Sequence, residues 1–185
     1  MSHLIENFRL SARNNRYANA MLATACAELG EAGVWAPGVN FFPSIGETLN
    51  HILLIDLYYL DMMEEEGHGL SVIDEFEPFR DPAALACRQE AQDIRLIRFC
   101  DALTEADLAR IVLADRRAGK VPERIDRLLP HLFMHDVHHR GQIHAMLAGT
   151  SVKPPQLDDF WLDDRRAPEA EAALAMTGAA KVHHA

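Results

Sequence analysis

The stretch HLFMHDVHHRGQIH, residues 131–144, holds five of the ten histidines in this chain of 185 residues. Its apolar positions recur with a helical period, and an α-helix has 3.6 residues per turn. On such a helix His131, His135 and His139 lie four residues apart and share one face, which His138 joins. A stripe of imidazoles on one helix is typical of a metal site built inside a helical protein.

A sixth histidine, His51, lies in a second helical stretch, SIGETLNHILLIDLYYLD, residues 44–61. Imidazoles packed together in a core are unfavourable unless something bridges them, and a transition metal takes one ring nitrogen from each neutral imidazole. His51 and two histidines four residues apart therefore predict a three-ligand site. Spacing alone allows either His131 with His135 or His135 with His139 as the helical pair. Three protein ligands with open positions are typical of a catalytic or substrate-binding centre, because structural zinc sites fill all four positions.

Length and composition restrict the class of protein. The chain is 49% hydrophobic and 25% charged, which is ordinary for one globular domain. Its net charge of -10 argues against nucleic acid and against an anionic membrane as partners, so we expect a small-molecule substrate. The most apolar stretch, ILLIDLYYLDMM, contains Asp56 and Asp61 and is too short to span a bilayer.

The three cysteines, Cys26, Cys87 and Cys100, are odd in number and form no CxxC pair. This pattern indicates reduced thiols in a cytoplasmic protein rather than a disulfide framework. We expect all three to be small buried hydrophobic residues without a reactive role.

Four long helices are predicted, at residues 4–29, 44–67, 81–103 and 122–149. Capping residues mark two of their starts. Ser44 and Glu47 form a capping box at the second helix, and Asp81 precedes Pro82 at the first position of the third.

Polar residues interrupt the apolar faces of the first two helices. Asn15 and Asn19 lie on the buried face of the first helix. Because a buried amide must be hydrogen-bonded, we expect them to join helices, with the border of a polar cavity as the alternative. Asp56 lies about 140° around the second helix from His51, so we expect a structural acid near the site rather than a ligand. Arg140 is its hypothesised partner.

The remaining segments complete the predicted layout. The third helix is expected to face inward with Cys87, Ala91, Ile94 and Ile97. Residues 110–121 predict a short extended or hairpin segment around Gly119. Residues 154–162, PPQLDDFWL, are expected to be extended and docked on the body, and the charged, alanine-rich segment after them to form a frayed short helix.

Three stretches of this chain resemble the DinB family of bacterial damage-inducible-type proteins: FFPSIGETLNHILLIDLYYL, HLFMHDVHHRGQIHAML and PPQLDDFWL. The similarity covers residues 8–162, and its most specific parts are the TLNH and HxxxHRGQ motifs. In that family one histidine of the second helix and both histidines of HxxxHRGQ bind the metal. The resemblance therefore implies His51, His135 and His139 as ligands and resolves the choice that spacing left open.

The resemblance also implies an architecture. It is an all-α four-helix bundle, up-down-down-up, with a long crossover between helices two and three, and frequently a homodimer. We expect residues 1–163 to form this DinB-like domain with its docked extended segment, and residues 164–185 to form a tail that is flexible in part or a short helix.

The family is related to the bacillithiol- and mycothiol-dependent transferases. The resemblance thus implies a metal-dependent enzyme of the thiol S-transferase type that acts on a small electrophile, with a low-molecular-weight thiol as cosubstrate. One alternative is a metal-dependent hydrolase with Glu47, one turn before His51, as base. The other is a non-catalytic metal-binding stress-response protein. Zinc or nickel is the expected metal, with iron or copper as alternatives. No residue of the sequence is assigned a catalytic role.

An Arg-lined cavity would favour the transferase, and a carboxylate aimed at metal-bound water would favour the hydrolase. A fourth protein ligand would favour the non-catalytic alternative.

Overall fold

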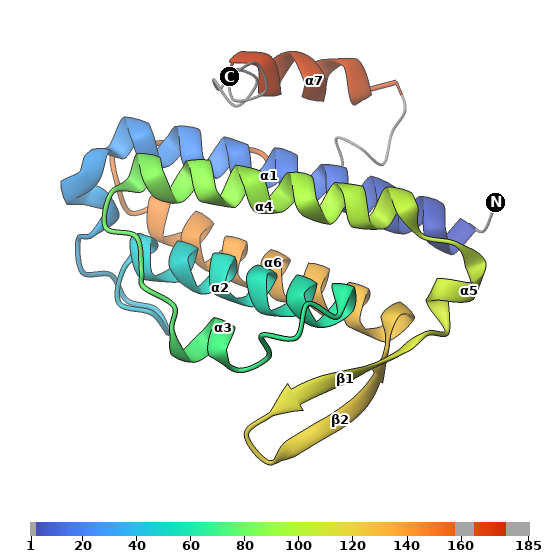
Figure 1. The fold of residues 1–185 in the computed structure, drawn as a ribbon. Coiled ribbons are helices and arrows are strands. Elements are labelled where there is room, and N and C mark those ends of the chain that lie inside the picture. Colours follow the sequence, from blue (N-terminus) through green and yellow to red (C-terminus); the bar gives the residue numbers. More distant parts are fainter. Residues whose placement is uncertain (1–2, 158–164, 177–185) are drawn as a thin grey trace.

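The computed structural model describes residues 3–157 and 165–176, and this part of the chain is mostly helical with one small hairpin (Figure 1). In chain order the elements are α1 (His3–Val34), α2 (Ile45–Glu64), α3 (Ser71–Asp74), α4 (Pro82–Ala102), α5 (Glu105–Leu108), β1 (Ile111–Arg116), β2 (Gly119–Arg124), α6 (Ile125–Leu147) and α7 (Ala167–Met176). The four predicted long helices are present, as α1, α2, α4 and α6.

Capping residues fix the starts of α2 and α4, as predicted. The Ser44 hydroxyl accepts a hydrogen bond from the Glu47 backbone N–H at 3.1 Å and donates one to the Glu47 carboxylate at 2.8 Å. The Asp81 carboxylate accepts from the backbone N–H of Ala83 at 3.0 Å. Pro82 then occupies the first helical position, where a missing N–H is tolerated.

Two predicted helix ends differ from the structure. The second helix ends at Glu64, and the left-handed residue that closes it is Glu65, at φ 59°, rather than Gly67. The first helix does not stop at residue 29. It continues to Val34 across Gly30, whose φ of 76° interrupts the regular helix geometry where the prediction had placed the end.

The structure contains a hairpin at this position, and the last long helix therefore begins later than predicted. Strands β1 and β2 are antiparallel and turn at Gly119, whose φ of 118° favours glycine. Pro122 was predicted to start the helix, but it pairs with Leu113 in the hairpin. Because this sheet has only two strands, both are edges, where proline is tolerated. Helix α6 therefore begins at Ile125.

The four long helices lie side by side, with α1 against α4, α2 against both α4 and α6, and α6 also against α1. Figure 1 shows α2 and α4 running in one direction and α1 and α6 in the other. Two apolar clusters fill the space between them. The cluster nearer the hairpin includes Phe8, Leu60, Met63, Leu96 and Leu132. The other includes Leu22, Cys26, Ile52, Ile143 and Leu147.

A layer of buried polar side chains separates these two clusters along the helices. Because of it, the buried face of α4 differs from the predicted one. Cys87 and Ala91 are exposed, and Ile94 and Ile97 are only partly buried. The buried residues of α4 are instead Leu85, Gln89, Glu90, Gln92, Asp93, Leu96 and Cys100. The prediction failed because it assigned the buried face by apolar residues, whereas α4 turns two amides and two acids inward, where they form hydrogen bonds with other helices.

The described part of the tail contains the predicted short helix. Ala170 and Leu174 of α7 pack against Tyr17 and Ala20 of α1. Leu157 packs against the cluster around Leu22, while residues 158–162 of the predicted extended segment lie outside the described residues. Among the helices described, none combines the length and apolarity needed to cross a membrane.

Replacing Gly46 with alanine should destabilise the protein by roughly 1–3 kcal/mol, because the new Cβ would lie 2.5 Å from the Trp35 ring. That ring cannot move freely, since its Nε1 donates to the Arg80 carbonyl at 2.9 Å and the Arg80 guanidinium lies 5.0 Å above it. Urea unfolding measures the change. The control is Gly141→Ala in α6, where a Cβ meets nothing within 4 Å and should stabilise by about 0.5–1 kcal/mol. A gain in both variants would contradict the packing at Gly46.

Candidate metal centre

Three histidines from two adjacent helices lie together on one side of the polar layer. His51 comes from α2, and His135 and His139 come from α6. One ring nitrogen from each lies within 4.8 Å of the others, so this group could hold a metal ion. The Nε2 atoms of His51 and His135 are 3.0 Å apart. Without an ion, one of these two nitrogens has to carry a hydrogen to satisfy the other.

Neighbouring side chains orient two of the rings. The Nδ1 of His139 is 2.9 Å from the Gln142 amide oxygen, and the Nδ1 of His135 is 3.3 Å from the Asp136 carboxylate. Both acceptors favour hydrogen on Nδ1 and leave Nε2 with a free lone pair, which is the usual outer contact of a metal-binding histidine. The amide nitrogen of Gln142 is in turn 3.0 Å from the Nε2 of His138.

Burial keeps these imidazoles in the form that binds metals. Together with the neighbouring rings of His135 and His139, it lowers the pKa of His51 to about 4. It also lowers the pKa of His135 to about 4 and shifts the pKa of His139 in the same direction. All three rings are therefore neutral at pH 7, and a neutral imidazole binds without first losing a proton.

Residues just before α2 cover one side of the group. The Phe42 ring lies 4.5 Å from the His51 ring and 5.7 Å from the His139 ring, measured between centroids. Phe41, which is exposed, meets Phe42 edge to face at 4.9 Å. A cavity of about 690 Å³ lies beside the centre, between residues 33–40 and α6, and Gln142 is one of its lining residues.

The other histidines of the sequence stretch lie outside this group. His131 is exposed, and its Nδ1 is 2.8 Å from the Tyr59 hydroxyl. His138 is also exposed and contacts Gln142, so it does not complete the stripe that spacing predicted. Of the two pairs that spacing allowed, the structure brings His135 and His139 together with His51.

A buried arginine connects α6 to the first helix behind the centre. Arg140 is 5% exposed and donates to the amide oxygens of both Asn15 and Asn19. The amide nitrogens of these asparagines donate to Asp93 of α4, at 3.2 and 2.9 Å. The predicted role of Asn15 and Asn19 in joining helices is therefore confirmed.

Asp56 belongs to the same network, but its partner was predicted wrongly. In the described part of the chain, the hydrogen bonds of Arg140 go to Asn15 and Asn19, and it forms no ion pair with Asp56. Instead the Gln89 amide donates to Asp56 at 2.7 Å and reaches Asp93 at 3.3 Å. The guanidinium of Arg140 is close enough to oppose the rise in the pKa of Asp56, but its hydrogen bonds go to α1.

The guanidinium acts directly on two buried carboxyls, those of Asp56 and Asp136, while Asp93 is joined to it through the two asparagines. Burial raises the pKa of Asp56 and of Asp93 well above the usual range, and raises that of Asp136 to about 7. Asp56 and Asp136 lie within hydrogen-bonding reach of each other, and each has an oxygen that receives no donor from the other described residues. The two carboxyls satisfy each other only by sharing a proton.

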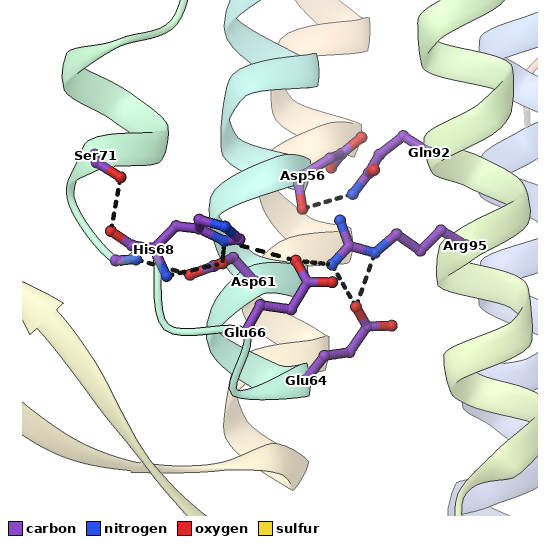
Figure 2. A network of polar contacts seen from close by, with 9 residues as sticks. Asp56, Asp61, Glu64, Glu66, His68, Ser71, Gln92 and Arg95 are labelled. Carbon is purple, nitrogen blue, oxygen red and sulfur yellow. Dashed lines mark hydrogen bonds and ion pairs between the residues drawn. The ribbon is translucent and has the colours of Figure 1, made fainter.

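A second group of potential ligands, Asp61, Glu66 and His68, lies at the end of α2 (Figure 2). The Asp61 carboxylate accepts from the backbone N–H groups of His68 and Gly69 and lies 2.6 Å from the His68 ring. Arg95 of α4 contacts Glu66 at 2.8 Å. These contacts already use the charged groups to hold the turn after α2 against α4, so the group is explained without a metal.

The cysteines and Glu47 lie away from the centre. Cys26 and Cys100 are buried, and burial raises the pKa of each thiol to about 12. Cys87 is exposed, contrary to prediction. Glu47 is exposed and bonded to Ser44 at the start of α2, and it is not part of the histidine group.

Fold and site together define a helical protein with a three-histidine group able to hold a metal ion. The DinB family model matches residues 1–171, and the chain belongs to the DinB family, as its TLNH and HxxxHRGQ motifs predicted. The chain is 26% identical over 149 residues to Protein DinB of Bacillus subtilis strain 168, an alignment that covers 76% of this chain and 85% of that protein.

Replacing Arg140 with methionine should cost roughly 3–5 kcal/mol of stability, because it leaves buried carboxyls and amide oxygens without their cation. Urea unfolding at pH 7 measures the loss. The matched control is Arg127→Met on the same helix, where the arginine is exposed and substitution should change stability by no more than about 0.5 kcal/mol. Equal effects in the two variants would show that the buried network does not depend on Arg140.

Proposed function

We propose that His51, His135 and His139 bind one divalent transition metal and that the loaded protein is an enzyme of the thiol S-transferase type. The observation that carries the proposal is the meeting of three neutral imidazoles with no fourth potential ligand in their group among the described residues. Zinc or nickel is the expected metal, with iron or copper as alternatives, since imidazole suits all four. The open positions are available to a low-molecular-weight thiol.

The chemistry supplied by a bound divalent metal is a lowered thiol pKa, which gives a nucleophile at neutral pH. The residues of this chain orient the metal ligands and cover the site. Gln142 and Asp136 hold the rings of His139 and His135. Phe42 lies against His51 and restricts water on that side.

The cavity beside the centre is our proposed position for the small electrophile. Among its described lining residues are Asn40, His138, Gln142 and Met146, with no lysine, arginine or acid. The Arg-lined cavity that would have favoured the transferase is therefore not found among these lining residues. This wall fits an uncharged electrophile.

The hydrolase alternative is less well supported, because its predicted base is engaged elsewhere. Glu47 holds the Ser44 hydroxyl at the start of α2. The carboxylate nearest the centre, Asp136, contacts the Nδ1 of His135, on the side of the ring away from the donor nitrogen. The non-catalytic alternative would require a fourth protein ligand.

We also propose the finer architecture that the family implies. Residues 1–163 would form an up-down-down-up four-helix bundle, with residues 65–81 as the crossover between α2 and α4. The common direction of α2 and α4 in Figure 1 supports this assignment. A homodimer is supported by Met134 and Val137 of α6, which are apolar yet 64% and 61% exposed. A cytoplasmic location fits the free cysteines.

Replacing His51 or His139 with alanine should abolish stoichiometric metal in the purified full chain, because two imidazoles hold an ion far less tightly than three. Elemental analysis after dialysis measures the content. His131→Ala is the control, since that ring contacts Tyr59 and lies outside the group. Full metal content in both the His51 and His139 variants would refute the site.

Cobalt-substituted protein should change its visible spectrum when small thiols are added, and turnover of an electrophile should require both thiol and metal. The change should disappear in His135→Ala, which removes a ligand and its contact to Asp136. Turnover that proceeds equally well without thiol would support the hydrolase instead. No spectral change with any of a panel of thiols would contradict the transferase.

A further inference from the structure

A second cavity, of about 440 Å³, opens between α1 and α4 and has none of the three metal-site histidines in its wall. Small residues on both helices create it. They are Ala20, Ala23 and Ala27 of α1 and Ala83 and Ala86 of α4. Leu49 and Ile52 of α2 and Met176 of α7 complete a largely apolar wall. The volume is within the range of small-molecule sites.

One part of the wall is polar. Asn19, Gln89 and Asp93 line the cavity, and Asp93 is 1% exposed. The Oδ1 of Asp93 accepts from both amides, whereas its Oδ2 has no hydrogen-bond partner among the described residues. A buried carboxyl oxygen without a donor is costly, so this atom is a place for a donor that the described chain does not supply.

The charges of the lining residues restrict which kind of donor can bind in the cavity. The titratable lining residues described are Glu90, Asp93 and two cysteines, with no lysine, arginine or histidine among them. Glu90 is already paired with Arg16 at 2.6 Å. The carboxyl still available is therefore that of Asp93, and a cation suits it best.

We propose that this cavity binds a small primary amine with an apolar chain. The ammonium group donates to Asp93, and the chain lies along the alanines of α1 and α4. Burial raises the pKa of Asp93 well above its usual range, and a bound cation favours the carboxylate and so offsets this effect. The cavity shares no lining residue with the histidine group, and binding of the amine does not require a bound metal.

Calorimetric titration of the full chain with n-hexylamine at pH 7, beside n-hexanol and hexanoate, tests the proposal. The amine should bind at least about tenfold more tightly than the alcohol, the scale of one hydrogen bond to a charged group. Hexanoate should not bind. At pH 7 nearly all of the amine is protonated and has no lone pair for a metal, so the titration reports mainly on the cavity and not on the histidines. Equal affinity for amine and alcohol, or no binding of the amine, would overturn the proposal.

Two variants distinguish the effect of the Asp93 charge on binding from the effect of the cavity's shape. Asp93→Asn should remove the preference for the amine over the alcohol. Ala86→Leu should fill the cavity and abolish binding of both, and it keeps the test valid if the buried asparagine impairs folding. The matched control is Ala91→Leu, because Ala91 is exposed on the same helix and does not line the cavity. Undiminished binding in Ala86→Leu would place the amine elsewhere and refute the site.

Cys87 provides a local measurement. It lines the cavity and is exposed, whereas Cys26 and Cys100 are buried. Bound hexylamine should slow alkylation of Cys87 by a bulky maleimide in the native chain, and the protection should persist in Ala91→Leu and disappear in Ala86→Leu. An unchanged alkylation rate at saturating amine would contradict occupation of the cavity.

Discussion

The burial of the Arg140 guanidinium is the constraint on which the rest of this structure depends. A cation in a core needs acceptors and opposite charge, and here the acceptors come from α1, while acids on α2 and α6 lie close to it. Apolar contacts alone would tolerate some sliding of one helix along another. Directed hydrogen bonds between Asn15, Asp93, Gln89 and Asp56 do not, and they fix the relative heights of α1, α2 and α4.

The histidine group follows from that fixed arrangement. His139 directly precedes Arg140, and His135 directly precedes Asp136, so the two residues of each pair point to different sides of α6. One of each pair belongs to the buried network and the other to the centre with His51. The contact between Asp136 and the His135 ring joins the two systems directly. Any metal held by these histidines therefore binds against a rigid polar layer and not a mobile surface.

Much of this could be predicted from the sequence, because helical periodicity and capping are local. The positions of α1, α2, α4 and α6 followed from apolar spacing, Ser44 and Asp81. The family motifs selected the three histidines. The inward face of α4 was missed, since burial of Gln89, Gln92 and Asp93 depends on hydrogen-bond partners from other helices. Gln142 was missed as well, although its position three residues after His139 places both on one side of α6.

The hairpin at Gly119 has a consequence for how this chain can change in length. One residue added within α6 before His139 would rotate every following side chain by about 100°, so that His139 would take the place of Arg140, and Arg140 that of the exposed Gly141. A residue added at the hairpin tip alters only the exposed turn at residues 117–120. Insertions and deletions among relatives should therefore accumulate at this tip, while the number of residues from Ile125 to Leu147 stays constant.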